Sequence, residues 1–379
     1  MSDFLRTLPW TTLAMRAVFA DAAVIGHALA FEAALARAEA AEGVISTAVA
    51  AQIVEACRTM SVDPVALAEE AALAGTLAIP LVARLRDALS GDAVAAAHRG
   101  ATSQDVADTV MMMQARAASA LVLTDLDRVS VALADLAARH ASRPAIGRTL
   151  LQDALPLSFG LRIAHWMTGV DEAAQRVRHE AARCQVQLGG AAGTRAGLAD
   201  RGAAIAAHVA ADLGLVAAEP WQARRGDIAA LASAVAIAIG ALGKMARDIS
   251  LLAQNAVGEA REPAIVGRGG SSAMAHKRNP TGCQVALSAA IRAPGLVAAI
   301  LSGLPQEEER GLGGWQAEGP ALADLFLLAA GAADAMAIVA EGLEIDTVAI
   351  ARNLAAAEIG TDIGESAAIV AALLARHKG

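Results

Sequence analysis

The chain contains few of the residue types that build sheets, disulfide frameworks or basic surfaces. Tyrosine is absent from its 379 residues, and only four tryptophans, five phenylalanines and 11 prolines occur. Alanine dominates an apolar fraction of 56%, and alanine has the highest helix propensity of all residues. The composition therefore predicts an all-α protein whose long helices pack closely.

Cysteine is also scarce. Cys57, Cys184 and Cys283 are odd in number and far apart in the sequence, and they lack the spacing of metal ligands. This excludes a disulfide framework and predicts three small core residues with reduced thiols. The N-terminal residues show no export signal. We therefore expect a cytoplasmic protein.

Acidic residues outnumber basic ones, and the formal net charge is −8. Non-specific nucleic-acid binding needs a basic surface, so we expect no nucleic-acid partner. No His-Glu-x-x-His spacing, phosphate loop or nucleotide fingerprint occurs, so we expect neither a metal nor a cofactor. The apolar stretch 228–243 is shorter than the roughly 20 residues of a membrane span. It lies between Asp227 and Lys244, which favours a buried helix and no membrane partner.

Helical periodicity predicts a small domain followed by a bundle. The segment 20–41 places Ala28, Phe31 and Leu35 on one stripe, with Glu32 and Glu39 off it. Longer helical patterns predict a central bundle, and they cover 103–141, 153–187, 226–260, 280–304 and 320–342. We expect an N-terminal helical domain over 1–97, a central domain with the site motifs over 98–342, and a short helical segment over 343–379.

A glycine-rich segment, 267–280, leads into the fourth of these helices. Asn279 and Pro280 form a typical helix start, with asparagine as N-cap and proline at the first helical position. One interpretation is a flexible surface loop with a solvated basic run. The other is a catalytic loop in which a serine moves a proton at the carbon next to a carboxylate. Backbone amides and the charge of Lys277 would then stabilise the serine oxyanion.

The first long helix is preceded by a capping box. Thr102-Ser-Gln-Asp105 has the spacing in which a threonine and an acidic residue satisfy the first backbone amides of a helix. A helix N-terminus that carries hydroxyl groups is also a good position for a carboxylate. The segment therefore predicts a structural cap and is compatible with a substrate site.

Four segments resemble the fumarase/aspartase superfamily. The segment 270–280 resembles its signature Gly-Ser-Ser-x-Met-Pro-x-Lys-x-Asn-Pro at seven of eight fixed positions, with Ala275 where the family has proline. The segments 98–109 and 147–156 resemble its substrate-binding stretches. The segment 306–318 is similar to the Glu-Arg-x-x-Gly-x-Trp-Gln-Ala-Glu stretch of the carboxymuconate cycloisomerase branch. A weaker likeness covers 188–194.

One position separates the branches of this superfamily. Leu150 stands where the lyases that cleave adenylosuccinate or argininosuccinate have a histidine, which protonates or orients the leaving group. Lactone formation needs no such group, because the carboxylate that attacks or leaves requires no proton. The substitution favours the cycloisomerase branch.

The resemblance implies the fold of the superfamily, with a fumarase/aspartase-like bundle, and a cycloisomerase that converts 3-carboxy-cis,cis-muconate to 4-carboxymuconolactone in protocatechuate degradation. It implies a homotetramer that binds this small polycarboxylate in sites built from three chains. Ser271 is implied as the proton-transferring residue, with His98 as a second catalytic candidate. The implied substrate-binding residues are Thr102, Ser103, Arg148, Thr149, Gln152, Ser272, Met274, Lys277, Asn279 and Arg310.

Two alternatives stay open. The first is a lyase of the same superfamily, similar to adenylosuccinate lyase, that releases fumarate; Leu150 and the segment around Trp315 disfavour it. The second is a helical scaffold without activity, which Ala275 and the short C-terminal segment allow. The presence of Ser271 and Lys277, which the chemistry needs, argues against a scaffold.

Overall fold

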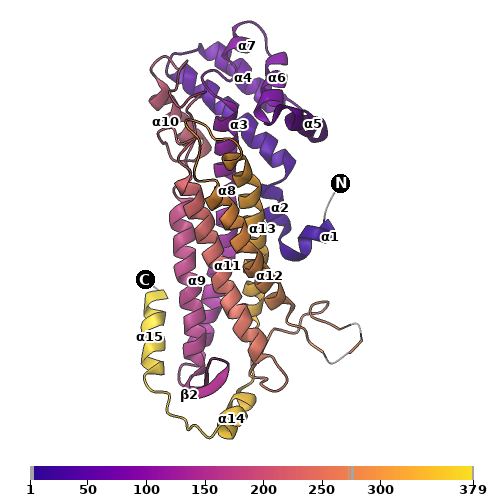
Figure 1. Ribbon diagram of the computed structural model, residues 1–379, viewed down its shortest axis with the longest axis vertical. Helices are drawn as coiled ribbons and strands as arrows, with labels where there is room; N and C mark the ends of the chain where they lie inside the picture. The colour runs from indigo at the N-terminus through magenta and orange to yellow at the C-terminus, as the bar shows by residue number, and fades with distance from the viewer. Residues whose placement is uncertain (1–3, 272, 275–276, 378–379) are drawn as a thin grey trace.

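The computed structural model describes residues 4–271, 273–274 and 277–377. Long helices form an elongated bundle with shorter helices at one end (Figure 1). The all-α expectation is confirmed. The long helices are α8 (Ser103–Arg139), α9 (Phe159–Ala181), α11 (Gly226–Leu252), α12 (Thr281–Ser302) and α13 (Gly314–Glu341).

The main core runs along the bundle axis, where α8, α9, α11 and α13 bury their apolar faces against one another. Leu126, Ile163, Met245 and Phe326 are fully buried there. The predicted thiols are confirmed as well, because all three cysteines are free and buried.

Helix α12 packs on α11 and α13 but leaves one face uncovered. The exposed positions between 291 and 301 are apolar except for Arg292. The apolar ones are Ile291, Pro294, Gly295, Ala298, Ala299 and Leu301. An apolar face of this size in contact with water is unfavourable, so it indicates a surface that another molecule covers.

Three of the described helices are long and apolar enough to cross a membrane by length and composition. Helix α11 has 27 residues and extends well beyond the stretch 228–243. Its apolar window is 61% buried inside the protein, that of α13 is 72% buried, and that of α12 is 22% buried. Helix α11 is therefore a helix of the protein core, as its sequence predicted.

The shorter helices gather at one end of the bundle (Figure 1). Helix α10 (Gly202–Leu213) packs on α3 (Asp21–Ala41) and completes a second core. The other short elements are α1 (Phe4–Thr7), η1 (Leu8–Trp10), α2 (Leu13–Val18), α4 (Thr47–Thr59), α5 (Pro64–Ala74), α6 (Ala78–Asp87) and α7 (Asp92–Ala96).

The sequence interpretation of helix α3 was wrong for two charged residues. Glu32 and Glu39 were assigned to the polar side, yet they are 2% and 0% exposed. Each lies one helical turn after a residue of the apolar stripe, and α4, α8 and α10 all pack against this helix. Helix α3 is consequently enclosed on several sides, and its carboxylates lie in the interior.

A β-hairpin stands where the sequence predicted the start of a helix at 153. Strand β1 (Pro144–Thr149) pairs antiparallel with β2 (Gln152–Ser158), and α9 begins only at Phe159. The turn consists of Leu150 and Leu151, whose φ angles are 52° and 65°. Positive φ at both turn residues matches the twist of a two-residue hairpin, and the helical pattern of 153–187 did not reveal it.

The C-terminal residues return along the bundle. Strand β3 (Ala260–Arg261) pairs with β4 (Glu344–Ile345), and α14 (Thr347–Ala356) lies beside β1. Helix α15 (Ser366–His377) then runs along α9 (Figure 1).

Candidate active site

The start of α8 is fixed by a buried carboxylate. The predicted capping box is confirmed: Asp105 accepts a hydrogen bond from the Thr102 amide at 3.0 Å. The same side chain accepts from the amides of Gly189 and Gly190, both at 2.9 Å. Burial raises the pKa of Asp105 to about 6 against these hydrogen bonds, which lower it. The glycine-rich loop 188–194 is thereby held against the helix start.

Arg310 lies over this helix start. Its guanidinium donates to the Thr102 hydroxyl at 3.2 Å and to the carbonyls of Gly190 and Ala191 at 3.2 and 3.1 Å. All three acceptors are neutral oxygens. Its buried Nε has no hydrogen-bond partner among the described residues. A guanidinium charge next to a helix N-terminus is a strong position for a carboxylate ligand.

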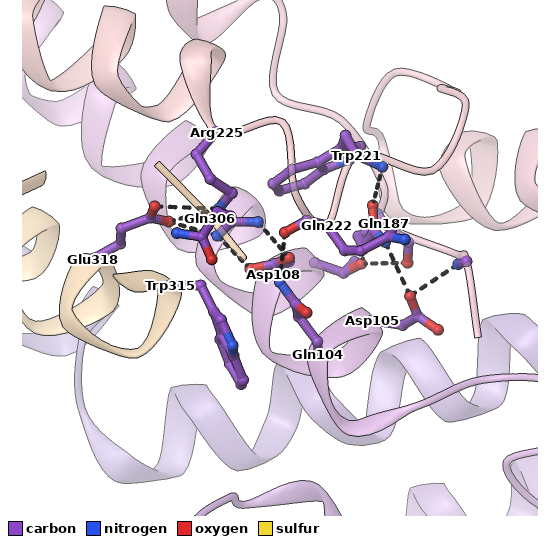
Figure 2. Close-up of polar contacts among 12 residues, drawn as sticks. Gln104, Asp105, Asp108, Gln187, Trp221, Gln222, Arg225, Gln306, Trp315 and Glu318 are labelled. Atoms are coloured by element: carbon purple, nitrogen blue, oxygen red, sulfur yellow. Dashed lines mark hydrogen bonds and ion pairs between the residues drawn. The ribbon is translucent and has the colours of Figure 1, made fainter. Parts of the chain in front are cut away.

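A buried ion cluster lies beneath the same region (Figure 2). Arg225 donates to Asp108 at 2.7 and 2.8 Å and to Glu318 at 2.9 Å, and its guanidinium lies 4.8 Å from the ring centroid of Trp221. Burial raises the pKa of both carboxyls against the effect of the arginine. The cluster ties α8 to the starts of α11 and α13.

Sequence reasoning did not identify this cluster. Arg225 and Asp108 were not singled out, and Glu318 was noted only as part of a motif. Asp108 is a charged residue within the apolar pattern of 103–141, and this was the available signal. The pattern does not indicate which distant residue contacts it.

His98 lies next to the capping box and contacts α3, a helix of the second core. Its Nδ1 is 2.7 Å from a carboxylate oxygen of Glu32. Its backbone has φ 63°, a left-handed conformation that is uncommon outside glycine. The pairing joins α3 to the segment in front of α8.

The glycine-rich loop presents Ser271 at the protein surface. The Ser271 hydroxyl accepts from the amides of Ala273 and Met274 at 3.3 and 3.1 Å. Lys277 is exposed. Gly269 has φ 71°, and a Cβ there would stand 2.6 Å from the Asn279 carbonyl, so this turn requires glycine. Ser272 and Ala275 lie outside the described residues.

The predicted capping role of Asn279 is wrong. Its side chain donates to the Gly270 carbonyl at 3.2 Å, and Pro280 occupies the N-cap position of α12. The first amides of this helix, those of Gly282 and Cys283, instead donate to the carboxylate of Glu262 at 3.0 and 2.7 Å. An acidic side chain from 20 residues upstream therefore replaces the local cap.

The hairpin carries the third group of predicted residues. Arg148 forms an ion pair with the buried Glu259, with hydrogen bonds of 2.7 and 3.0 Å. Thr149 and Gln152 are exposed at the tip, and Leu150 between them is 93% exposed. Arg148 therefore anchors the hairpin, and the tip points outward.

The structure brings only some of the predicted residues together. Arg310 contacts Thr102, and Ser103 and His98 lie in the same segment as Thr102. Helix α8 has 37 residues, so it separates this region from the hairpin by about 55 Å. Helix α12 has 22 residues and separates the Ser271 loop from Arg310 by about 33 Å. Among the described residues, no group of three or more histidine, cysteine, aspartate and glutamate side chains is placed to hold a metal.

Comparison with known proteins defines the class. A family model described as Lyase matches residues 11–295. The chain therefore belongs to this lyase family, which is part of the fumarase/aspartase superfamily, and the resemblance inferred from the motifs is confirmed.

Two individual relatives and one solved structure are similar to this chain over most of its length. A 3-carboxy-cis,cis-muconate cycloisomerase from Pseudomonas aeruginosa is 47% identical over 345 residues, 90% of this chain and 75% of that protein. A nitrosuccinate lyase from Streptomyces davaonensis is 40% identical over 355 residues, 90% of this chain and 74% of that protein. The crystal structure of a 3-carboxy-cis,cis-muconate lactonizing enzyme from Pseudomonas putida matches with a TM-score of 0.92, at 33% identity and 99% coverage of both chains.

Proposed function

We propose that this protein is a cycloisomerase that converts 3-carboxy-cis,cis-muconate to 4-carboxymuconolactone in protocatechuate degradation. The observation that carries the proposal is the 47% identity to the cycloisomerase of P. aeruginosa over 90% of the chain. The free cysteine thiols support a cytoplasmic location. Arg310 fits the proposal, because its hydrogen bonds go only to neutral oxygens and its charge is available to a substrate carboxylate.

The reaction places negative charge on the substrate. One carboxylate adds across a double bond, and a second carboxylate together with the carbon next to it becomes an enediolate. That carbon then takes up a proton. Positive charge and hydrogen-bond donors must stabilise this intermediate. We assign that role to Lys277, Asn279, Arg310 and the start of α8, and we propose Ser272 and Met274 as further substrate-binding residues.

We assign the proton transfer of this reaction to Ser271. Its hydroxyl oxygen accepts from two backbone amides, and such donors stabilise an alkoxide more than an alcohol. Ser271→Ala should lower kcat about 100-fold or more, the usual size of an acid–base contribution. Steady-state kinetics at saturating substrate measure it. Activity close to that of the unmodified protein would remove Ser271 from the mechanism.

We further propose a homotetramer whose sites combine three chains. Two observations support it: the apolar face of α12 is exposed, and long helices keep the predicted site segments about 33 to 55 Å apart in one chain. A seven-carbon acid cannot bridge such distances. Thr149 and Gln152 on the hairpin tip would meet the substrate held by Thr102 and Ser103 of another subunit.

The test is the ultraviolet absorbance of 3-carboxy-cis,cis-muconate after addition of purified protein without metal or cofactor. Rapid loss of the conjugated-diene band supports the proposal. The 40% identity to a nitrosuccinate lyase favours one alternative, a fumarate-releasing lyase, so nitrosuccinate and adenylosuccinate are assayed in parallel for fumarate formation. Fumarate formation with a stable diene band would select the lyase, and a folded protein inactive on all three would select the scaffold.

A further inference from the structure

Glu32 is a buried carboxylate with a single described partner. It lies on α3 and is 2% exposed. One oxygen contacts His98 Nδ1 at 2.7 Å, and the other oxygen has no hydrogen-bond partner among the described residues. A buried carboxylate with so few hydrogen bonds needs a positive charge beside it, and the imidazole ring of His98 can supply that charge.

The surroundings of His98 hold its backbone as well as its ring. Arg86 on α6 donates to the Ala97 carbonyl at 3.0 Å, directly in front of the histidine. Thr102 follows four residues later and donates its amide to Asp105. Both ends of the short segment 97–102 are therefore anchored, and the strained φ of 63° at His98 is maintained between these anchors.

We propose that Glu32 is a positioning residue for the reaction, which holds His98 by Nδ1 so that its Nε2 serves as a charged donor to the substrate at Thr102 and Arg310. This inference rests on the proposed function. Among the described residues His98 hydrogen-bonds only through Nδ1, so Nε2 is the atom available to a ligand. An imidazolium there would stabilise the enediolate, and the Glu32–His98 pair would remain neutral as a unit.

The charges around the ring agree with a protonated histidine. Burial lowers the pKa of His98, but the hydrogen bond and charge of Glu32 and the charge of Asp105 raise it further, so that it lies above its ordinary value against the opposing charge of Arg86. Two further titratable groups lie near the pair: Glu39 on α3, whose raised pKa keeps it protonated and uncharged near neutrality, and Arg99, which acts on Glu39.

The decisive variant is Glu32→Gln, which keeps the shape of the side chain and removes its charge. We expect the His98 pKa to fall, measured in the free protein by an NMR titration in which His98→Gln assigns the resonance among the eight histidines. We also expect kcat/KM to fall roughly ten- to hundredfold, the size of a charge-assisted hydrogen bond. As pH rises, kcat/KM of the variant should decline at a lower pH than kcat/KM of the unmodified protein, because His98 loses its imidazolium proton at a lower pH in the variant.

Two controls separate positioning from general damage. Glu39→Gln changes the same residue type at another buried position of α3 and should leave the His98 titration unmoved. In a His98→Gln background, Glu32→Gln should cause no further loss of kcat/KM, because Glu32 acts only through the histidine. An unchanged titration, or additive losses in the double variant, would overturn the inference. An inactive unmodified protein would refute the proposed function and the reaction role of Glu32 together.

Discussion

Buried charges in this protein follow two patterns. Arg225 is compensated from two sides by Asp108 and Glu318 within hydrogen-bond distance, which is the arrangement that a buried ion needs. Glu39 has no such partner: it is fully buried, and neither carboxylate oxygen has a hydrogen-bond partner among the described residues. An ionised carboxylate in this position would add the much larger cost of an uncompensated buried charge, so the group stays protonated in the folded protein near neutrality.

Glu39 therefore makes stability depend on pH. Burial raises its pKa from 4.5 to about 8, with Arg99 opposing and Glu32 adding to the shift. Between these two values the unfolded chain has released the proton and the folded protein has kept it. The free energy of unfolding therefore falls as pH rises through this window and then levels off.

Glu39→Gln should remove that loss of stability. We expect the stability of the variant relative to the unmodified protein to rise by roughly 1–3 kcal/mol between pH 5 and pH 9, because only the glutamate has to release its proton in the protein interior. Urea unfolding at the two pH values measures the difference. Glu69→Gln, at an exposed position of α5, is the matched control and should show no such trend. An equal stability difference for Glu39→Gln at both pH values would contradict the argument.

At the scale of elements, the start of α12 is tied to the loop that carries Ser271. The loop 263–280 returns to Glu262, which binds the amides of Gly282 and Cys283. This cap fixes both ends of the loop that carries Ser271. It also compensates for Pro280 and Asn279, which leave the helix without a side-chain cap of its own.

Glu262→Ala should free these two amides. We expect a loss of about 1 kcal/mol in stability, as for other helix caps, and faster hydrogen exchange at Gly282 and Cys283, measured by mass spectrometry on peptides from α12. Glu262→Gln keeps one acceptor oxygen and should give an intermediate effect. Exchange at the unmodified rate in Glu262→Ala would show that the cap is not needed.

Local signals determined which elements could be predicted. The capping box at Thr102 placed the start of α8 correctly, and the periodicity predicted that five long helices exist, because both signals lie within one element. Their bounds were less exact, and α9 begins at Phe159 rather than at 153. The hairpin after residue 144 was missed, because its turn uses Leu150 and Leu151 at positive φ, and neither residue is a typical turn former. The cap from Glu262 was missed because it comes from outside the helix.

At the scale of the molecule, the motifs name residues for one candidate site, but a single chain does not bring these residues together. The signature segment 270–280 pointed to Ser271 and the segment 306–318 pointed to Arg310, yet α12 keeps the two residues about 33 Å apart. Motifs report which side chains a site uses. They do not report which chain supplies each of them, because that depends on contacts between surfaces such as the apolar face of α12.

Subunit mixing tests this arrangement. Ser271→Ala and Arg310→Met should each be nearly inactive as pure proteins. If each site takes its serine and its arginine from different chains, co-expression of the two variants in equal amounts creates some sites with both native residues. Random assembly then restores roughly one quarter of the unmodified activity, measured by loss of the diene band after purification of the mixed oligomer. If one chain supplied both residues, every mixed site would keep one defect and activity would stay at the level of the pure variants.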